Sequence, residues 1–130
     1  MINIALIGLG RIGQMHGENL FLHTDYKLKY VFDVDKELTN KIAKKFNSKA
    51  INYPRLAFKD EEIDVIFIAS STSTHIKLIE EAAKYKKVIF CEKPLDLSIE
   101  KINKCKKKIK SLKPKIQLGF NRRYDPGHNS

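Results

Sequence analysis

Short apolar runs alternate with longer amphipathic segments along most of the chain. The apolar runs have the length of strands. We expect six strands, at residues 2–8, 27–33, 49–52, 65–69, 88–91 and 115–120. Four of the six are apolar at consecutive positions, which is typical of strands that helices cover on both faces. The alternation therefore predicts repeated βα units and a parallel sheet.

The segments between these strands have the period of helices. We expect helices at residues 11–22, 36–46, 74–85 and 98–111. In the last of them Ser98 is a good N-cap. Its apolar stripe consists of Ile99, Ile102, Cys105, Ile109 and Leu112. The whole pattern predicts an α/β fold, a doubly wound parallel sheet of the Rossmann type in strand order 3-2-1-4-5-6. We expect this fold to form one domain at residues 1–125, followed by a disordered tail at residues 126–130.

Composition narrows the partners of this domain. The 130 residues carry a formal net charge of +10, from 21 lysines and four arginines. Eight lysines lie between Lys101 and Lys115, but the apolar stripe already explains this segment as an outer helix with a solvated lysine side. Since arginine and aromatic residues are scarce there, neither base readout nor base stacking is encoded, and we expect no nucleic-acid partner.

The cysteines and the apolar runs bear on the compartment. Cys91 and Cys105 match no metal or redox spacing, so we expect reduced core residues, no metal site and a cytoplasmic location. The N-terminus lacks the basic region and cleavage site of an export signal. No apolar run reaches the roughly 20 residues that span a bilayer, so we expect no membrane partner.

The hexapeptide "GLGRIG" stands between the first predicted strand and the first predicted helix. Gly8 permits a tight turn, Gly10 lets a pyrophosphate approach the backbone, and Gly13 lets the helix pack on the strand. The N–H groups of Arg11, Ile12 and Gly13 would face the phosphate oxygens. The alternative is that these are ordinary turn glycines.

An acidic residue ends the second predicted strand. Asp33 follows Gly13 by 20 residues, the spacing at which a carboxylate accepts hydrogen bonds from the adenosine ribose hydroxyls. A 2′-phosphate would meet its negative charge, so NAD is favoured over NADP. Lys36 nearby weakens this preference, and a loop-capping role for Asp33 is the alternative.

One lysine stands between a glutamate and a proline in "FCEKPLDLS". Pro94 disfavours the helical region for Lys93, which is therefore expected to be extended directly beyond the fifth strand. Ligands of open parallel sheets sit at this edge. The ammonium group could donate a hydrogen bond to an alkoxide or ketone oxygen. An ordinary surface lysine is the alternative.

Four stretches, "ALIGLGRIGQMHGENL", "VFDVD", "FCEKPL" and "GFNRRYDP", together resemble the N-terminal domain of the glucose-fructose oxidoreductase and inositol 2-dehydrogenase family. The last is most similar to the inositol 2-dehydrogenase branch. The resemblance implies that Lys93 is catalytic, beside the nicotinamide and the reacting hydroxyl. It also implies that Glu92 and Arg122 lie near the cofactor. His16 matches a family histidine that we interpret as packed or polar-satisfied.

A hydroxyl-rich turn follows the fourth predicted strand. The resemblance aligns His75 with a family histidine near the cofactor, and we include Ser70, Ser71 and His75 among the predicted cofactor-binding residues. The residues themselves favour a different interpretation, in which Ser73 or Thr74 caps the helix and His75 packs on the apolar face.

Family members are two to three times longer, and their second α/β domain supplies the catalytic base. The resemblance therefore implies an NAD-binding domain of an inositol 2-dehydrogenase-like oxidoreductase, which transfers hydride from a polyol or sugar alcohol to NAD. We expect the second domain of the family to be absent from this chain. The chain alone should therefore be inactive, and a substrate should bind only when the second domain is present. An apolar patch left uncovered at the carboxyl edge would favour a homo-oligomer. A stand-alone NAD-binding or regulatory module, or a truncated inactive product, are the alternatives.

Overall fold

A computed structural model describes residues 1–119 of the chain, which form a sheet with helices on both faces. The strands are β1 (Ile2–Ile7), β2 (Tyr26–Phe32), β3 (Lys49–Ala50), β4 (Val65–Ile68), β5 (Val88–Glu92) and β6 (Lys115–Gly119). The helices are α1 (Arg11–Leu22), α2 (Lys36–Lys45), α3 (Arg55–Lys59), α4 (Thr72–Ala83) and α5 (Ile99–Ile109), the last continued by a 3₁₀ turn, η1 (Lys110–Leu112).

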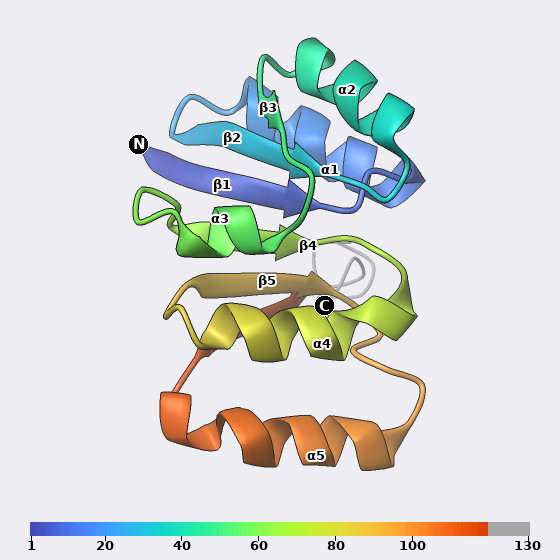
Figure 1. Cartoon of the computed structure of the whole chain (residues 1–130), viewed down its shortest axis with the longest axis vertical. Coiled ribbons are helices and arrows are strands. Elements are labelled where there is room, and N and C mark those ends of the chain that lie inside the picture. Colours follow the sequence, from blue (N-terminus) through green and yellow to red (C-terminus); the bar gives the residue numbers. More distant parts are fainter. Residues whose placement is uncertain (120–130) are drawn as a thin grey trace, which may run out of the picture.

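The strand order is β3-β2-β1-β4-β5-β6, and every neighbouring pair is parallel. This confirms the predicted doubly wound Rossmann sheet. All strands therefore end at the same edge, and the loops that follow β1, β2, β4 and β5 meet there (Figure 1). The strand order reverses between β1 and β4, which is where ligands of such sheets bind.

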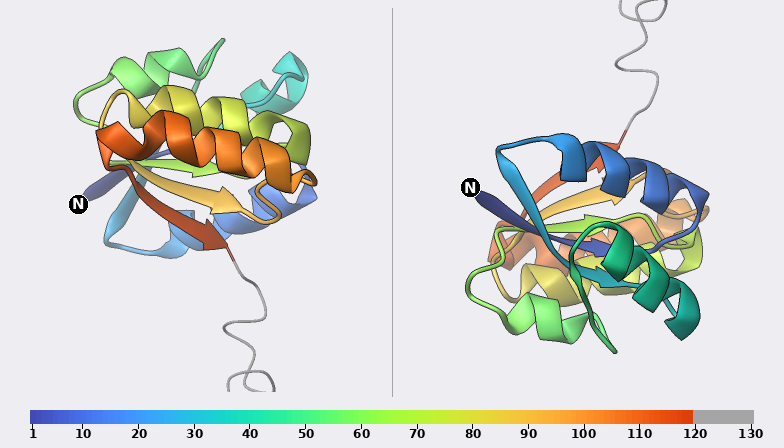
Figure 2. Two further views of the ribbon diagram at one scale, coloured as in Figure 1. Left: turned by 90° about the horizontal axis from the view of Figure 1, so that it is seen from below. Right: turned by 90° about the horizontal axis from the view of Figure 1, so that it is seen from above.

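Both faces of the sheet are covered, as the consecutive apolar runs predicted. Figure 2 shows α1 on one face and α4 and α5 on the other. Leu6 and Val31 pack with Phe46, which follows α2, in one core cluster. Ile66 and Ile89 belong to a second cluster, which contains residues of α3, α4 and α5.

The helices differ from the predictions in three places. The short helix α3 was not predicted, because five residues after Pro54 have no readable period. The prediction that Ser73 or Thr74 caps α4 is wrong, since Ser71 precedes the first helical residue and makes no side-chain capping bond. In α5, Ser98 is the N-cap, as predicted. The apolar stripe is buried at Cys105 and Ile109, but Ile99, the first residue of the helix, is 76% exposed.

Cys91 and Cys105 are buried and form no disulfide, which confirms their predicted core positions. Among residues 1–119, no cluster of three metal-ligating side chains occurs. Within the same residues, every helix is too short or too polar to cross a bilayer.

Candidate functional site

The glycine loop between β1 and α1 is built so tightly that two positions tolerate no side chain. Gly8 has a φ of +101°, and a Cβ atom there would lie 2.3 Å from the backbone nitrogen of Ser70. A Cβ at Gly13 would lie 2.0 Å from the carbonyl oxygen of Gly8. These two contacts hold β1, α1 and the end of β4 together, as predicted for a turn glycine and a packing glycine.

Gly10 is different, because neither its backbone conformation nor the neighbouring protein atoms require a glycine there. Its φ of −70° suits any residue, and no heavy atom outside its two chain neighbours lies within 4 Å of a Cβ built on it. Gly10 lines a cavity of about 490 Å³ at the carboxyl edge of the sheet. Its missing side chain thus leaves room for a ligand to approach the backbone.

The N-terminus of α1 faces this cavity. Arg11 and Ile12 line it together with Gly8 and Gly10, and the first turn carries no acidic residue. The first N–H groups of a helix have no partner within the helix and, with the helix dipole, favour an anion. The loop therefore fits a phosphate group.

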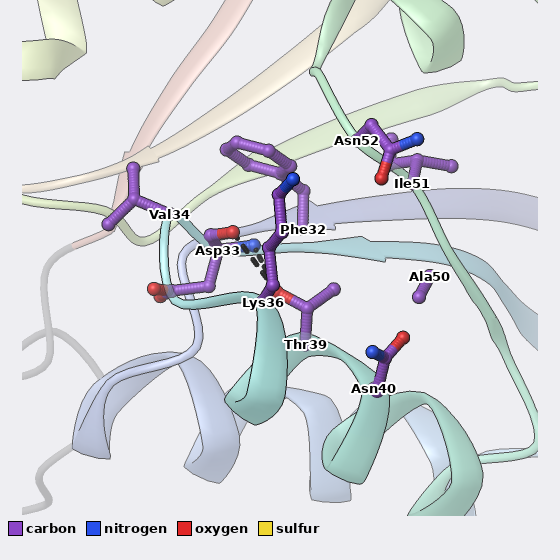
Figure 3. Close-up of a pocket in the computed structure, with 9 residues that line it drawn as sticks. All are labelled: Phe32, Asp33, Val34, Lys36, Thr39, Asn40, Ala50, Ile51 and Asn52. Atoms are coloured by element: carbon purple, nitrogen blue, oxygen red, sulfur yellow. Dashed lines mark hydrogen bonds between the residues drawn. The ribbon is translucent and has the colours of Figure 1, made fainter.

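Asp33, directly after β2, is fixed by the loops around it. One carboxylate oxygen accepts a hydrogen bond from Leu9 N at 2.8 Å, and the other accepts one from Asp35 N at 3.0 Å. The Asp33 N–H donates to the hydroxyl of Thr39, which is buried in α2 (Figure 3). Because a carboxylate oxygen can accept two hydrogen bonds, each keeps capacity for a ligand hydroxyl.

A second cavity of about 300 Å³ continues from Asp33 toward β3. It shares Phe32, Asp33 and Val34 with the first cavity. Its other wall consists of Lys36, Thr39, Asn40, Ala50, Ile51 and Asn52 (Figure 3). Because they share these residues, the two cavities adjoin at Asp33, and a ligand that binds there has room on both sides of this carboxylate.

The hydroxyl-rich turn after β4 forms the opposite wall. Ser70 and Ser71 line the larger cavity with Thr74. The hydroxyls of Ser70 and Thr74 lie 2.6 Å apart, and the Thr74 hydroxyl donates to the carbonyl of Ser71. The structure thus brings the predicted residues of this turn together with the glycine loop and Asp33.

His75 lies beneath this wall, only 2% exposed. Its Nδ1 is 2.9 Å from the carbonyl oxygen of Pro94, and its Nε2 is 2.9 Å from that of Ser70. It is not among the residues that line the cavity, so the packing interpretation describes its place. A direct contact between His75 and a cofactor stays a prediction.

Glu92 ends β5 and is 8% exposed. Its carboxylate pairs with Nε2 of His16 on α1, whose ring lies 4.7 Å from that of Phe67. The sequence predicted a packed or polar-satisfied His16, but it did not identify this partner, because 76 residues separate the two. Lys93 follows at once, exposed and joined to Pro94 by a cis peptide bond. The predicted Arg122 lies outside the described residues.

The cysteine beside this site is not a nucleophile. Burial, with a smaller contribution from the neighbouring Glu92 carboxylate, raises the pKa of the Cys91 thiol to about 12. The thiolate is the reactive form. Cys91 is therefore inert at neutral pH. The groups at this edge that can bind a ligand are the backbone amides, hydroxyls, carboxylates and ammonium group described above.

Comparison with known proteins shows which family shares this sequence. The family described as "Oxidoreductase family, NAD-binding Rossmann fold" matches residues 2–120. The chain is 37% identical over 125 residues to the myo-inositol 2-dehydrogenase of Thermotoga maritima, and 35% identical over 125 residues to the inositol 2-dehydrogenase of Rhizobium meliloti. These matches cover 95% and 96% of this chain.

A solved structure shows the same fold. The scyllo-inositol dehydrogenase from Lactobacillus casei, with bound NAD(H) and scyllo-inositol, superposes with a TM-score of 0.90 at 30% identity, covering 99% of this chain and 39% of that one. Likewise, the chain spans 37% and 38% of the length of the two curated relatives. The similarity therefore concerns one part of longer proteins.

Proposed function

This chain belongs to the oxidoreductase family with an NAD-binding Rossmann fold, and we propose that it binds and orients NAD within a dehydrogenase that oxidises a secondary alcohol of an inositol-like polyol. The observation that carries the proposal is the cavity shared by Gly10, Asp33 and Ser70. Its chemistry changes along its length, from unpaired helix amides at one end to a carboxylate with spare acceptor capacity at the other. That order matches the pyrophosphate and the ribose of a dinucleotide.

The residues present fit this cofactor. The N–H groups of Arg11, Ile12 and Gly13 would hold the pyrophosphate, which the bare Gly10 lets approach. Asp33 would accept hydrogen bonds from the adenosine ribose. When bound, NAD supplies the hydride acceptor, and the chain's own groups orient it and exclude water from the apolar part of the cavity.

Lys93 is the proposed catalytic residue. It directly follows β5 at the carboxyl edge, where its ammonium can donate a hydrogen bond to the reacting oxygen and stabilise developing negative charge. Glu92 and Arg122 are proposed to lie near the cofactor and the substrate. The hydroxyl proton needs a base, which we propose is supplied by residues beyond these 130, because the relatives are more than twice as long.

Exposed apolar side chains support a covering partner, and the cysteines bear on the location of the protein. Val34, Leu97 and Ile99 are 89%, 88% and 76% exposed near the carboxyl edge, and such apolar side chains favour a covering surface. We therefore propose either a second domain or a homo-oligomer as that cover. We also propose a cytoplasmic location, which fits two buried cysteines that are not joined by a disulfide.

The cofactor preference tests the assignment of the site. Calorimetric titration should show tighter binding of NAD than of NADP, because Asp33 repels a 2′-phosphate. Asp33→Asn removes the charge and should narrow this difference. Asp25→Asn is the matched control, since Asp25 is exposed in the turn before β2, and it should leave both affinities unchanged. Equal affinity of the unmodified chain for the two cofactors would contradict the proposal.

A second candidate function is a stand-alone module that binds NAD without turnover. What supports it is that residues of this chain alone line the cavity with the glycine loop, Asp33 and Ser70. The distinguishing experiment adds a family-type second domain to the chain and follows NADH formation from NAD and myo-inositol by absorbance. A dehydrogenase domain should then form NADH in a way that depends on Lys93. A stand-alone module should bind NAD but form no NADH with the added domain.

A further inference from the structure

His75 connects two segments that are distant in sequence and adjacent in the fold. It lies in the first turn of α4, with one ring nitrogen 2.9 Å from the carbonyl oxygen of Ser70 and the other 2.9 Å from that of Pro94. Ser70 follows β4 and Pro94 follows β5, and these strands are neighbours in the sheet. The ring therefore bridges the cavity wall and the loop that carries Lys93.

The bridge is polar although its surroundings are apolar. His75 is 2% exposed, and its helical neighbour Ile79 is 1% exposed within the core cluster. Both partners of the ring are carbonyl oxygens, which only accept hydrogen bonds. A ring with a single N–H donates to one of them, and a doubly protonated ring donates to both. If packing were its whole role, an apolar side chain of similar size would serve without these bonds.

We propose that His75 is a positioning residue, which holds the loop of Lys93 in register with the Ser70 wall of the dinucleotide cavity. It acts through Pro94, whose carbonyl lies one residue beyond Lys93, and it does not line the cavity itself. The inference rests on the proposed function, because it assigns the Lys93 ammonium a fixed place beside the nicotinamide. Without the bridge, the loop would still follow β5 and Leu95 would still pack on the core, but the hydrogen-bond contact between α4 and the residue after Lys93 would be lost.

The test uses the fluorescence of NADH bound to the 130-residue chain, since its emission reports the surroundings of the nicotinamide ring. His75→Phe keeps a ring and removes the hydrogen bonds, whereas His75→Gln keeps one donor and one acceptor. Ile79→Val is the matched control, because it perturbs the same buried face of α4 without touching the bridge. Lys93→Ala and the double variant His75→Phe/Lys93→Ala complete a double-mutant cycle.

At saturating NADH, His75→Phe should lose the part of the bound-state emission that Lys93→Ala loses, and the double variant should lose no more than Lys93→Ala alone. His75→Gln should recover part of the emission, and Ile79→Val should match the unmodified chain. Full emission in the folded His75 variants, or additive losses in the double variant, would overturn the inference. If His75→Phe does not fold, His75→Gln enters the same cycle with Lys93→Ala. Failure of the unmodified chain to bind NADH would instead contradict the proposed function.

Discussion

Replacing Gly10 by alanine should separate folding from cofactor binding. Apart from its two chain neighbours, no residue of the described chain places a heavy atom within 4 Å of the added methyl group, and the backbone has an ordinary φ of −70°. Alanine also restricts the unfolded chain more than glycine does. We therefore expect the variant to fold with unchanged stability, or with a gain of about 0.4–1 kcal/mol in the free energy of unfolding.

The same substitution should weaken the binding of NAD. A phosphate oxygen reaches a loop amide only at about 2.7–3.2 Å, and the methyl group would occupy the approach to the backbone beside Arg11 and Ile12. One hydrogen bond to a charged group contributes roughly 1.5–3 kcal/mol. Losing one such bond would weaken NAD binding about 10- to 150-fold, since every 1.4 kcal/mol is a factor of ten.

Calorimetric titration with NAD and thermal unfolding of the same samples measure both effects. Asn19→Ala is the control, since Asn19 is exposed on α1 and outside the cavity. Gly13→Ala should fail to fold normally, because its Cβ would lie 2.0 Å from the carbonyl oxygen of Gly8. Unchanged NAD affinity in Gly10→Ala, or loss of its fold, would refute the reasoning.

Three further predictions concern charge, thiols and catalysis. Hydrogen bonds from Lys29 and then Tyr30 lower the pKa of Asp60 to about 2, so its stabilisation should be complete above about pH 4 and lost as the pH falls toward 2. Asp60→Asn should thus lower the free energy of unfolding by roughly 0.2–1 kcal/mol at pH 7, as measured by urea unfolding. This difference between the variant and the unmodified chain should vanish in acid. A difference that persists at pH 2 would exclude the ion pair as its cause. Burial raises the pKa of both thiols, so a thiol reagent at pH 8 should label neither until the chain is unfolded; immediate labelling of the native chain would contradict this. In a protein extended by a family-type second domain, Lys93→Ala should reduce turnover about 10²- to 10⁴-fold with NAD affinity nearly unchanged, and full turnover would remove Lys93 from the mechanism.

The sheet and the glycine loop could be predicted because their signals are local. Continuous apolar runs indicated buried parallel strands, and the spacing of Gly8, Gly10 and Gly13 identified a turn whose geometry the structure shows to admit no side chain at two of the three positions. The strand order followed from the same pattern. The helix α1 has the predicted bounds, since a glycine-rich turn and a clear period define it.

The connections between distant segments could not be predicted in this way. Glu92 at the end of β5 and His16 in the middle of α1 meet only in the folded chain, and no period or motif links two residues 76 positions apart. The bridge of His75 to Ser70 and Pro94 depends likewise on the alignment of β4 with β5. The helical period correctly indicated that His75 is buried, but it carried no information on its partners.

Nuclear magnetic resonance of the ¹⁵N-labelled chain during titration with NAD maps the bound cofactor onto individual amides. We expect the largest shifts at Arg11, Ile12 and Gly13, with further shifts at Asp33 and Ser71 along the carboxyl edge. The amide signals at the opposite edge, such as that of Glu62 in the turn before β4, should not shift. Shifts confined to that opposite edge, or no shifts at saturating NAD, would mean that the glycine loop and Asp33 do not bind the dinucleotide.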